Sequence, residues 1–316
     1  MSILNQPFFH DEAAAFAKLE SVLWPNGPVC PHCGGTKVYA LTGVRSKASK
    51  KNPEGVERHG LKKCGNCRKQ FTVRVGTVFE SSHIPLHKAL QAVFLLCSSK
   101  KGISSHQLHR VLEITYEAAW FLSHRIREAM RSGSLAVPMG GAGGSGMVEA
   151  DETFIGRKKG MPVRNAYHHK NAVLSLVERG GEVRSFHVDK ANATHIMPIV
   201  KENIAKEAKV STDEANHYKS LGKHVAEHVA LNHKAEEWAR GEFTTNSVEG
   251  YFSIFKRGMK GVYQHCSEKH LHRYLAEFDF RFNNRVKLGV DDEARTHRAL
   301  QGVLGKRLTY RQPDSQ

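Results

Sequence analysis

Two closely spaced pairs of cysteines constrain the fold of this chain more than any other feature. They are Cys30-Pro31-His32-Cys33 and Cys64-Gly65-Asn66-Cys67. Each Cys-x-x-Cys turn directs two sulfurs at one ion, and two such turns complete a tetrahedral site. Four thiolates leave no open coordination position, so we expect a structural zinc ion; four thiols that were only buried would not require paired spacing. The pattern predicts a zinc ribbon.

The segments around the cysteines fit such a ribbon. The insert between the pairs, Gly43 to Gly60, is rich in Lys, Arg, Gly and Ser, which is typical of a solvated loop. After the second pair, apolar and polar residues alternate from Phe71 to Val75, as in a half-buried strand that closes the ribbon. Before the first pair, Phe8 to Trp24 has the pattern of an amphipathic helix that Asp11 can cap.

Positive charge dominates the composition. Lysines and arginines number 47 against 31 aspartates and glutamates, a formal net charge of +16. Such an excess predicts a polyanionic partner, most often a nucleic acid. The first residues lack the pattern of a targeting peptide, and the longest apolar run, Ala92 to Cys97, is too short to span a membrane. We therefore expect a soluble, cytoplasmic protein with no membrane partner, in a compartment that keeps cysteines reduced.

Three helices are expected between Ile84 and Met130. The last of them carries three basic side chains, His124, Arg125 and Arg127. Two short helices followed by a basic helix resemble a helix-turn-helix that contacts DNA, although any small helical bundle has a similar pattern. The glycine-rich run from Pro138 to Gly146 follows and predicts a flexible tether.

The pattern after the tether predicts an α/β domain. Strands are expected over 147–156, 171–179 and 182–188, followed by an amphipathic helix over 191–208 and a short strand that ends at Asp213. A meander of three strands, a crossing helix and another strand is the beginning of an RNase H-like fold.

Three carboxylates are expected to converge on this sheet. Asp151 lies on the first strand and Asp213 ends the fourth, and these two strands are neighbours in such a sheet. Glu249 arrives from a helix that follows. Carboxylates that share one space repel each other unless cations neutralise them, and oxygen-only ligands favour Mg²⁺ or Mn²⁺. The sequence therefore predicts a divalent-metal centre.

The helix that carries Glu249 also carries Lys256. The two residues are separated by two helical turns, so they project from one side of the helix, beside its apolar face. An alternative is that Glu249 forms a near capping box with Asn246 and only fixes the start of the helix.

Other polar residues near these positions leave alternatives open. Glu149 shares a strand face with Asp151 and could replace it as the first ligand, whereas Glu152 lies on the opposite face. Whether Glu149 or Glu152 assists Asp151 is not fixed by the pattern. His217 and His233 fit surface or core positions better than ligand positions, though either could contact DNA.

Six segments, in order along most of the chain, together resemble one family. They are CPHCGG at Cys30 to Gly35, KKCGNCRKQFTVRVGTVFE at Lys62 to Glu80, EADETFIGRK at Glu149 to Lys158, STDEANHY at Ser211 to Tyr218, TNSVEGYFSIFKRGMKGVY at Thr245 to Tyr263, and EFDFRFNNR at Glu277 to Arg285. With these motifs the chain resembles bacterial insertion-sequence transposases of the ISXO type, which join an N-terminal zinc ribbon to a DDE catalytic domain. One departure is Tyr263-Gln264-His265, where the family often has two histidines.

We therefore expect a multidomain protein that combines a β zinc ribbon, a small helical region and an α/β RNase H-like catalytic domain similar to retroviral integrases. The expected parts are an N-terminal helix and zinc ribbon over 1–76, a helix-turn-helix-like DNA-binding region over 77–137, a Gly-rich linker over 138–146, the catalytic domain over 147–290 and a C-terminal tail over 291–316.

The resemblance also implies an activity, DNA transposition. It implies that Asp151, Asp213 and Glu249 bind Mg²⁺ or Mn²⁺, and that Lys256 contacts DNA near the reacting phosphate. The implied partners are the DNA ends of the element, target DNA and further copies of this chain on that DNA, in a bacterial cytoplasm. Two alternatives are a zinc-ribbon DNA-binding regulator derived from an inactive transposase, and an RNase H-like nuclease without strand transfer.

Overall fold

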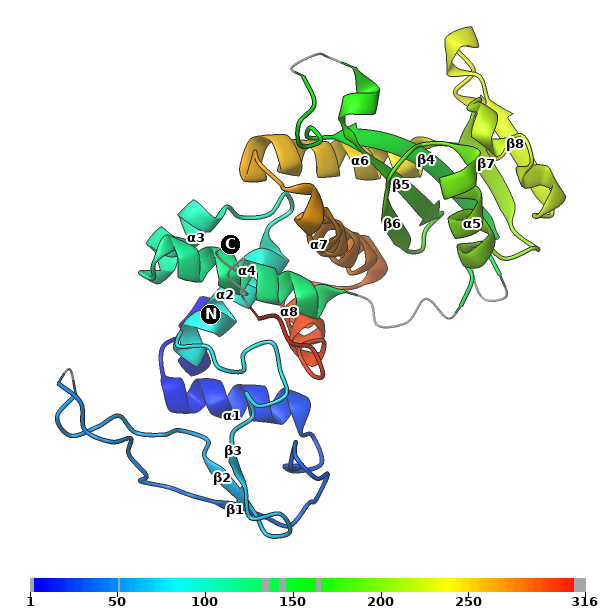
Figure 1. Ribbon diagram of the computed structural model, residues 1–316. Coiled ribbons are helices and arrows are strands. Elements are labelled where there is room, and N and C mark those ends of the chain that lie inside the picture. Colours follow the sequence, from blue (N-terminus) through cyan, green and yellow to red (C-terminus); the bar gives the residue numbers. More distant parts are fainter. Residues whose placement is uncertain (1–2, 51, 132–136, 142–145, 163–165, 310–316) are drawn as a thin grey trace. The chain divides into compact units, whose positions relative to one another are not determined.

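The computed structural model describes residues 3–50, 52–131, 137–141, 146–162 and 166–309, and the chain divides into two compact units (Figure 1). The first unit contains Met1–Ser99, Ile103–Met130 and Val290–Gln316, and the second contains Lys100–Gly102 and Arg131–Gly289. Among the described residues, no helix has both the length and the apolar character needed to cross a membrane.

The first unit begins with a helix and the ribbon. Helix α1 (Glu12–Leu23) starts at Asp11, whose carboxylate accepts a hydrogen bond from a first-turn amide at 2.7 Å, which confirms the predicted cap. Three short strands follow, β1 (Val38–Ala40), β2 (Lys62–Cys64) and β3 (Gln70–Phe71), and they pair antiparallel in the order β1-β2-β3. The ribbon predicted from the cysteine spacing is therefore present.

Four further α-helices of the described residues belong to the first unit. They are α2 (Leu86–Ser98), α3 (Ser105–Leu112), α4 (Tyr116–Met130) and α8 (Asp292–Gln301). The first three match the expected helical region. The last, α8, lies within the segment expected to be a C-terminal tail, and it packs against α2. Helix α8 thus belongs to the core of the first unit.

Helix α4 does not present the basic face that its sequence suggested. His124, Arg125 and Arg127 are only 1%, 7% and 1% exposed. The Arg125 guanidinium donates to the carbonyl of Glu80 at 2.9 Å, and that of Arg127 donates to the Ser123 hydroxyl at 2.9 Å. A cation removed from water needs such partners. The prediction that these three side chains contact DNA is therefore wrong, because they are used inside the protein.

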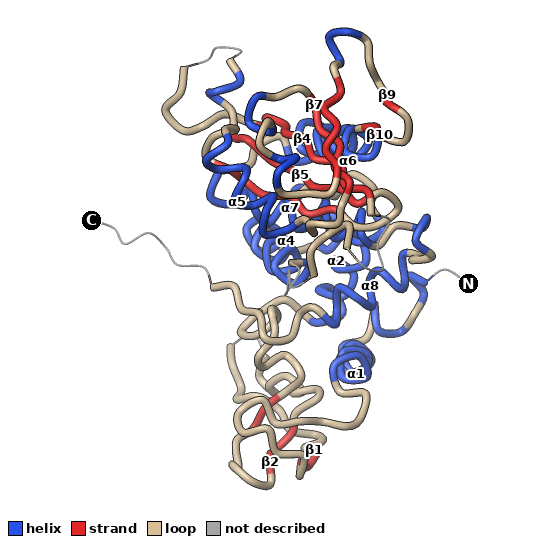
Figure 2. The backbone as a smooth tube through the Cα atoms, turned by 90° about the vertical axis from the view of Figure 1, so that its right-hand side faces the viewer, coloured by secondary structure: helices blue, strands red, loops and turns tan. Residues whose placement is uncertain are grey.

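A five-stranded mixed sheet forms the middle of the second unit (Figures 1 and 2). Its strands are β4 (Met147–Ile155), β5 (Asn171–Glu178), β6 (Val183–Val188), β7 (Lys209–Asp213) and β8 (Glu227–Leu231). The order is β6-β5-β4-β7-β8; β5 is antiparallel to both of its neighbours, and β4, β7 and β8 are parallel. This is the expected RNase H-like arrangement, extended by β8, which the sequence pattern did not predict.

Helices cover both faces of the sheet (Figure 2). Helix α5 (Ala193–Asn203) packs against one face, which includes Val148 of β4. Helices α6 (Asn246–Gly258) and α7 (Leu271–Asn283) pack against the other face, which includes Ile155 of β4. Successive side chains of a strand point to opposite faces, so the odd-numbered residues of β4 face α6.

Part of the expected Gly-rich linker packs onto the second unit. Met139 is buried; its amide donates to the carbonyl of Asn203 at 2.8 Å, and its carbonyl accepts from the amide of Ala205 at 2.9 Å. The rest of that linker, 142–145, lies outside the described residues. At Met139 the segment therefore has the contacts of a folded domain.

Candidate metal centres

The four paired cysteines come together in the ribbon. The Sγ atoms of Cys30 and Cys67 lie 3.7 Å apart, and those of Cys33 and Cys64 lie 3.6 Å apart. All four sulfurs lie within 4.8 Å of one another. A tetrahedron with Zn–S bonds of about 2.3 Å has sulfurs about 3.8 Å apart. The spacing therefore fits one metal ion held by four thiolates, with no coordination position left for a substrate.

Three carboxylates converge in the second unit. Asp151 and Glu152 of β4 and Asp213 at the end of β7 each offer an oxygen, and these oxygens lie within 4.8 Å of one another. Strands β4 and β7 are parallel and in register up to the pair Glu149 and Ser211, which brings Asp213 beside Asp151. A donor set made only of carboxylate oxygens fits a hard divalent cation.

Asp151 is the electrostatic centre of this cluster. Burial raises the pKa of Asp151 to about 7, and the negative charges of Glu152, Asp213 and Glu249 add to the rise. The amide of Glu152 donates to Asp151 at 2.7 Å and opposes the shift. A nearby cation would reverse the direction of the shift, because it favours the charged carboxylate.

Glu152 joins the cluster from the α5 face of the sheet. The Tyr218 hydroxyl donates to one of its oxygens, and Nε2 of His217 lies 2.9 Å from the other. Burial lowers the pKa of His217, but the hydrogen bond and charge of Glu152, together with the charges of Asp213 and Asp151, outweigh this effect and raise it. Strand alternation predicts the face of Glu152 correctly, but it does not predict that this carboxylate reaches the cluster or that His217 contacts it.

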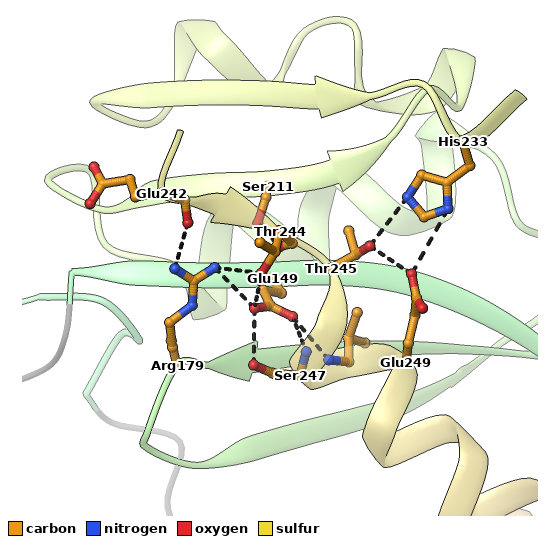
Figure 3. Close-up of polar contacts among 10 residues, drawn as sticks. Glu149, Arg179, Ser211, His233, Glu242, Thr244, Thr245, Ser247 and Glu249 are labelled. Carbon is orange, nitrogen blue, oxygen red and sulfur yellow. Dashed lines mark hydrogen bonds and ion pairs between the residues drawn. The ribbon is translucent and has the colours of Figure 1, made fainter. Parts of the chain in front are cut away.

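Glu149 is occupied in anchoring helix α6 (Figure 3). Its side chain is fully buried, and its carboxylate accepts from the amides of Ser247 at 2.7 Å and Val248 at 3.0 Å and from Arg179 at 3.2 Å. Amides in the first turn of a helix have no partner within the helix, and the helix dipole favours negative charge there. These contacts favour a positioning role for Glu149 over the alternative that it replaces Asp151 as a ligand.

Glu249 lies in the first turn of α6 (Figure 3). It is not among the three carboxylates whose oxygens lie within 4.8 Å of one another. Its Oε1 accepts from the Thr245 hydroxyl at 2.7 Å and lies 3.9 Å from Nδ1 of His233, and its side chain is 44% exposed. Helix α6 begins at Asn246, so Glu249 bonds the residue before the helix, and the capping box with Asn246 is not formed. Its charge still raises the pKa of Asp151, so it contributes to the same electrostatic environment.

Lys256 lies in the last turn of α6. Its Nζ is 5.7 Å from the centroid of the Phe252 ring. A helix rises 1.5 Å per residue, so Lys256 is about 10 Å from Glu249 along the helix axis. Helix α6 therefore carries a carboxylate at its start and an ammonium group at its end.

A second buried carboxylate ties α6 to the rest of the unit. Asp279 of α7 accepts from the amide of Ser185 at 2.9 Å, from the Ser185 hydroxyl at 2.7 Å and from the Tyr251 hydroxyl at 2.5 Å. Burial raises the pKa of Asp279 to about 7 despite these hydrogen bonds. Since Tyr251 follows Glu249 by two residues, this network fixes the helix that carries Glu249. The only sequence signal was the place of Asp279 in the EFDFRFNNR motif.

The chain is similar to several known proteins. Residues 144–283 match the model of a family described as the ISXO2-like transposase domain, and residues 10–70 match the transposase zinc-ribbon domain. The chain is 25% identical over 292 residues to an uncharacterized protein in transposable element ISH50 of Halobacterium salinarum, covering 86% of this chain and 91% of that protein. A pre-cleavage Mos1 transpososome aligns at 14% identity with a TM-score of 0.29, over 68% of this chain and 74% of that one. The Mos1 strand transfer complex aligns at 15% identity with a TM-score of 0.29, over 68% and 73%.

Proposed function

We propose that this chain, which matches the ISXO2-like transposase domain over residues 144–283 and the transposase zinc-ribbon domain over residues 10–70, cleaves DNA at the ends of an insertion element and joins these ends to target DNA. The observation that carries the proposal is the meeting of Asp151 and Asp213 from two parallel strands of an RNase H-like sheet. Carboxylates grouped in this way hold divalent cations, and such sites suit phosphoryl transfer.

Asp151, Asp213 and Glu249 are the proposed metal-binding triad. Two Mg²⁺ or Mn²⁺ ions held there would activate an attacking hydroxyl group and stabilise the leaving oxygen. Asp151 is central to the cluster and suits a bridging position, while Asp213 and Glu249 each complete one side. Glu249 is half exposed and tethered through Thr245, so its carboxylate is accessible. Lys256 would hold a DNA phosphate as a point charge. This scheme needs no Ser or Tyr nucleophile.

The ribbon has a different proposed task, which is to hold DNA. Zinc bound to the four thiolates would fix its turns. Arg68 and Lys69 follow the second cysteine pair and are exposed, so both can meet phosphates. Binding that depends on such contacts weakens as the salt concentration rises. Joining two element ends also calls for more than one copy of this chain on the DNA.

The proposal is tested with the purified full chain, Mg²⁺, a target plasmid and a duplex that carries the inverted repeat flanking its gene. The expected products are cuts that leave a 3′-OH at the repeat, followed by joined DNA. Cut DNA without a joined product would identify a nuclease instead. Absence of cutting with any divalent metal would identify a DNA-binding regulator.

A matched pair of variants makes the same experiment specific to the triad. Glu249→Gln keeps the size of the side chain and removes its charge, so it should abolish cleavage and leave DNA binding intact. Glu214 follows Asp213 in the chain, and its partly exposed carboxylate pairs with the exposed Lys234. Glu214→Gln removes this charge and should cleave DNA like the wild type. Full activity of Glu249→Gln would remove Glu249 from the triad.

A further inference from the structure

A pocket of about 250 Å³ lies in the second unit, at the end of β4 beyond the carboxylate cluster. It is lined by the end of β4, the start of β5 and the π-helix Met259–Tyr263 that continues α6. Ile155 and Met259 supply apolar walls, while Lys170 and the exposed Lys260 add positive charge. Apolar walls beside cations suit a ligand with an apolar body and an anionic group.

Asn171 supplies the most specific feature of this pocket. It lines the pocket and is only 2% exposed, and within the described part of the chain its Oδ1 has no hydrogen-bond partner. A buried acceptor left unpaired destabilises the fold. On the strand Asn171 is paired with Ile155, whose side chain offers no donor. A ligand that carries a donor group and reaches this side chain from the pocket would satisfy Oδ1.

The backbone beside the pocket is strained. The π-helix is followed by Gln264, which has a φ of +58°. Single π-turns and non-glycine residues with positive φ are costly, and they occur frequently at functional sites. Gln264 also lines the pocket, so the strained residue places a second amide in its wall.

The pocket is aligned with the proposed active site along two elements. Ile155 follows Asp151 by four residues on the same face of β4, about 13 Å along the strand. Lys260 follows Lys256 by four residues, where α6 passes into the π-helix, so it lies about one turn beyond that lysine. A DNA strand held by Lys256 would therefore pass close to the pocket.

We propose that this pocket binds one unpaired nucleobase of the DNA strand held at the proposed active site. Asn171 Oδ1 would accept from the amino group of the base, and Lys260 would hold the neighbouring phosphate. The inference rests on the proposed function, because it takes DNA as the ligand. A phosphodiester group of the DNA backbone does not fit by itself, since it offers no donor to Asn171. Enzymes that take a base out of the stack bind it in this way, with apolar walls and hydrogen bonds to its edge.

The test compares two labelled single strands of equal length, (dA)12 and an abasic 12-mer with the same phosphates, by fluorescence anisotropy with the full chain. Asn171→Leu keeps the approximate size of the side chain and removes the acceptor. It should weaken (dA)12 binding about three- to tenfold, the range of one hydrogen bond, and leave abasic binding unchanged. Lys260→Met should weaken binding of both strands. Equal (dA)12 affinity for the wild type and Asn171→Leu would overturn the inference.

Two controls keep this result interpretable. Asn171→Leu removes an unpaired buried polar atom, so its unfolding temperature should equal or exceed that of the wild type. Should this variant fail to fold, Cys266→Phe fills the pocket from another wall and should give the same selective loss; wild-type affinity for (dA)12 in that variant would overturn the inference. A wild-type chain that binds neither strand and cuts no DNA would overturn the proposed function itself. If the pocket variants bind and cut DNA like the wild type, only the proposal that the pocket binds a base would be overturned.

Discussion

The two candidate metal centres are built in opposite ways. In the ribbon, each pair of cysteines comes from one tight turn, so short sequence spacing fixes the positions of the sulfurs. In the second unit, Asp151 and Asp213 come from separate strands, and only the register of β4 and β7 brings them together. The position of the sulfurs within each cysteine pair is set by local sequence, whereas the position of the carboxylates is set by tertiary structure. We therefore expect the ribbon to depend on its metal for folding, and the carboxylate site to depend on its fold for metal binding.

Removing one thiolate should have the largest effect. Cys64→Ser leaves three ligands, and structural zinc contributes about 10 kcal/mol or more to the folding of small zinc domains. The variant should lose zinc, unfold its ribbon and bind DNA more weakly. Zinc content, thermal unfolding and DNA affinity measure this. Cys266→Ser, which changes a cysteine outside the ribbon, is the control for zinc content and unfolding. A Cys64→Ser chain with full zinc content and a wild-type unfolding curve would contradict the metal dependence of the ribbon.

Removing the central carboxylate should stop chemistry without unfolding the chain. Asp151→Asn takes away the proposed bridging ligand, and with it several kcal/mol of charge stabilisation, so cleavage should fall on the order of 10³-fold. In Mg²⁺-free buffer the same change should stabilise the second unit, because it removes a buried charge that its neighbours repel. Cleavage rates and unfolding midpoints measure the two effects. A variant that is both inactive and unfolded would show that Asp151 is structural.

The carboxylate site should also make stability depend on pH. The pKa of Asp151 is raised from 3.8 to about 7, so its contribution to stability is complete below about pH 4 and is lost as pH rises through 7. The shift corresponds to at most about 4 kcal/mol. Asp279 has a pKa raised to about 7 by burial and acts in the same direction. Denaturant midpoints between pH 4 and 8 should fall without Mg²⁺, fall less in Asp151→Asn, and recover when Mg²⁺ is added to the wild type.

The smallest of these effects should come from the anchor of α6. Glu149→Gln removes the buried charge that faces the helix start and Arg179, which should destabilise the second unit by about 3 kcal/mol. Cleavage should fall as well, because the same helix carries Glu249. Glu214→Gln, which breaks an exposed ion pair, should cost less than about 1 kcal/mol. Equal unfolding midpoints for the two variants would remove Glu149 from this role.

The same contrast explains what the sequence could and could not predict. Cysteine spacing is sufficient for the ribbon, because the geometry within each pair is set over four residues and two such pairs match one tetrahedral site. Short runs of strand-forming residues bounded by turn signals were sufficient to predict β4 to β7, and their expected order placed Asp213 beside Asp151. Alternation also gave the face of each β4 residue. It could not decide whether Glu149 or Asp151 is the candidate metal ligand, because both side chains face α6. Only the packing of that helix places its first turn against Glu149.

The predictions that were wrong in the first unit, for α4 and α8, have a related cause. Basic residues on a helix normally face solvent, so the sequence predicted that Arg125 and Arg127 form a DNA-binding face. Their partners, a carbonyl of Glu80 and the hydroxyl of Ser123, become visible only when the unit is packed. Helix α8 was missed because a polar helix at the end of a chain looks like a tail until α2 is placed against it.

The most direct test of this account is anomalous scattering from crystals of the full chain grown with Mn²⁺. We predict a peak bonded to carboxylate oxygens of both Asp151 and Asp213, at about 2.0–2.3 Å, the distances typical of such oxygen ligands. The same peak should be missing from Asp151→Asn crystals, in which the ribbon keeps its own metal. Mn²⁺ that binds elsewhere, with Asp151 and Asp213 left uncoordinated, would contradict the claim that these carboxylates form one divalent-metal centre.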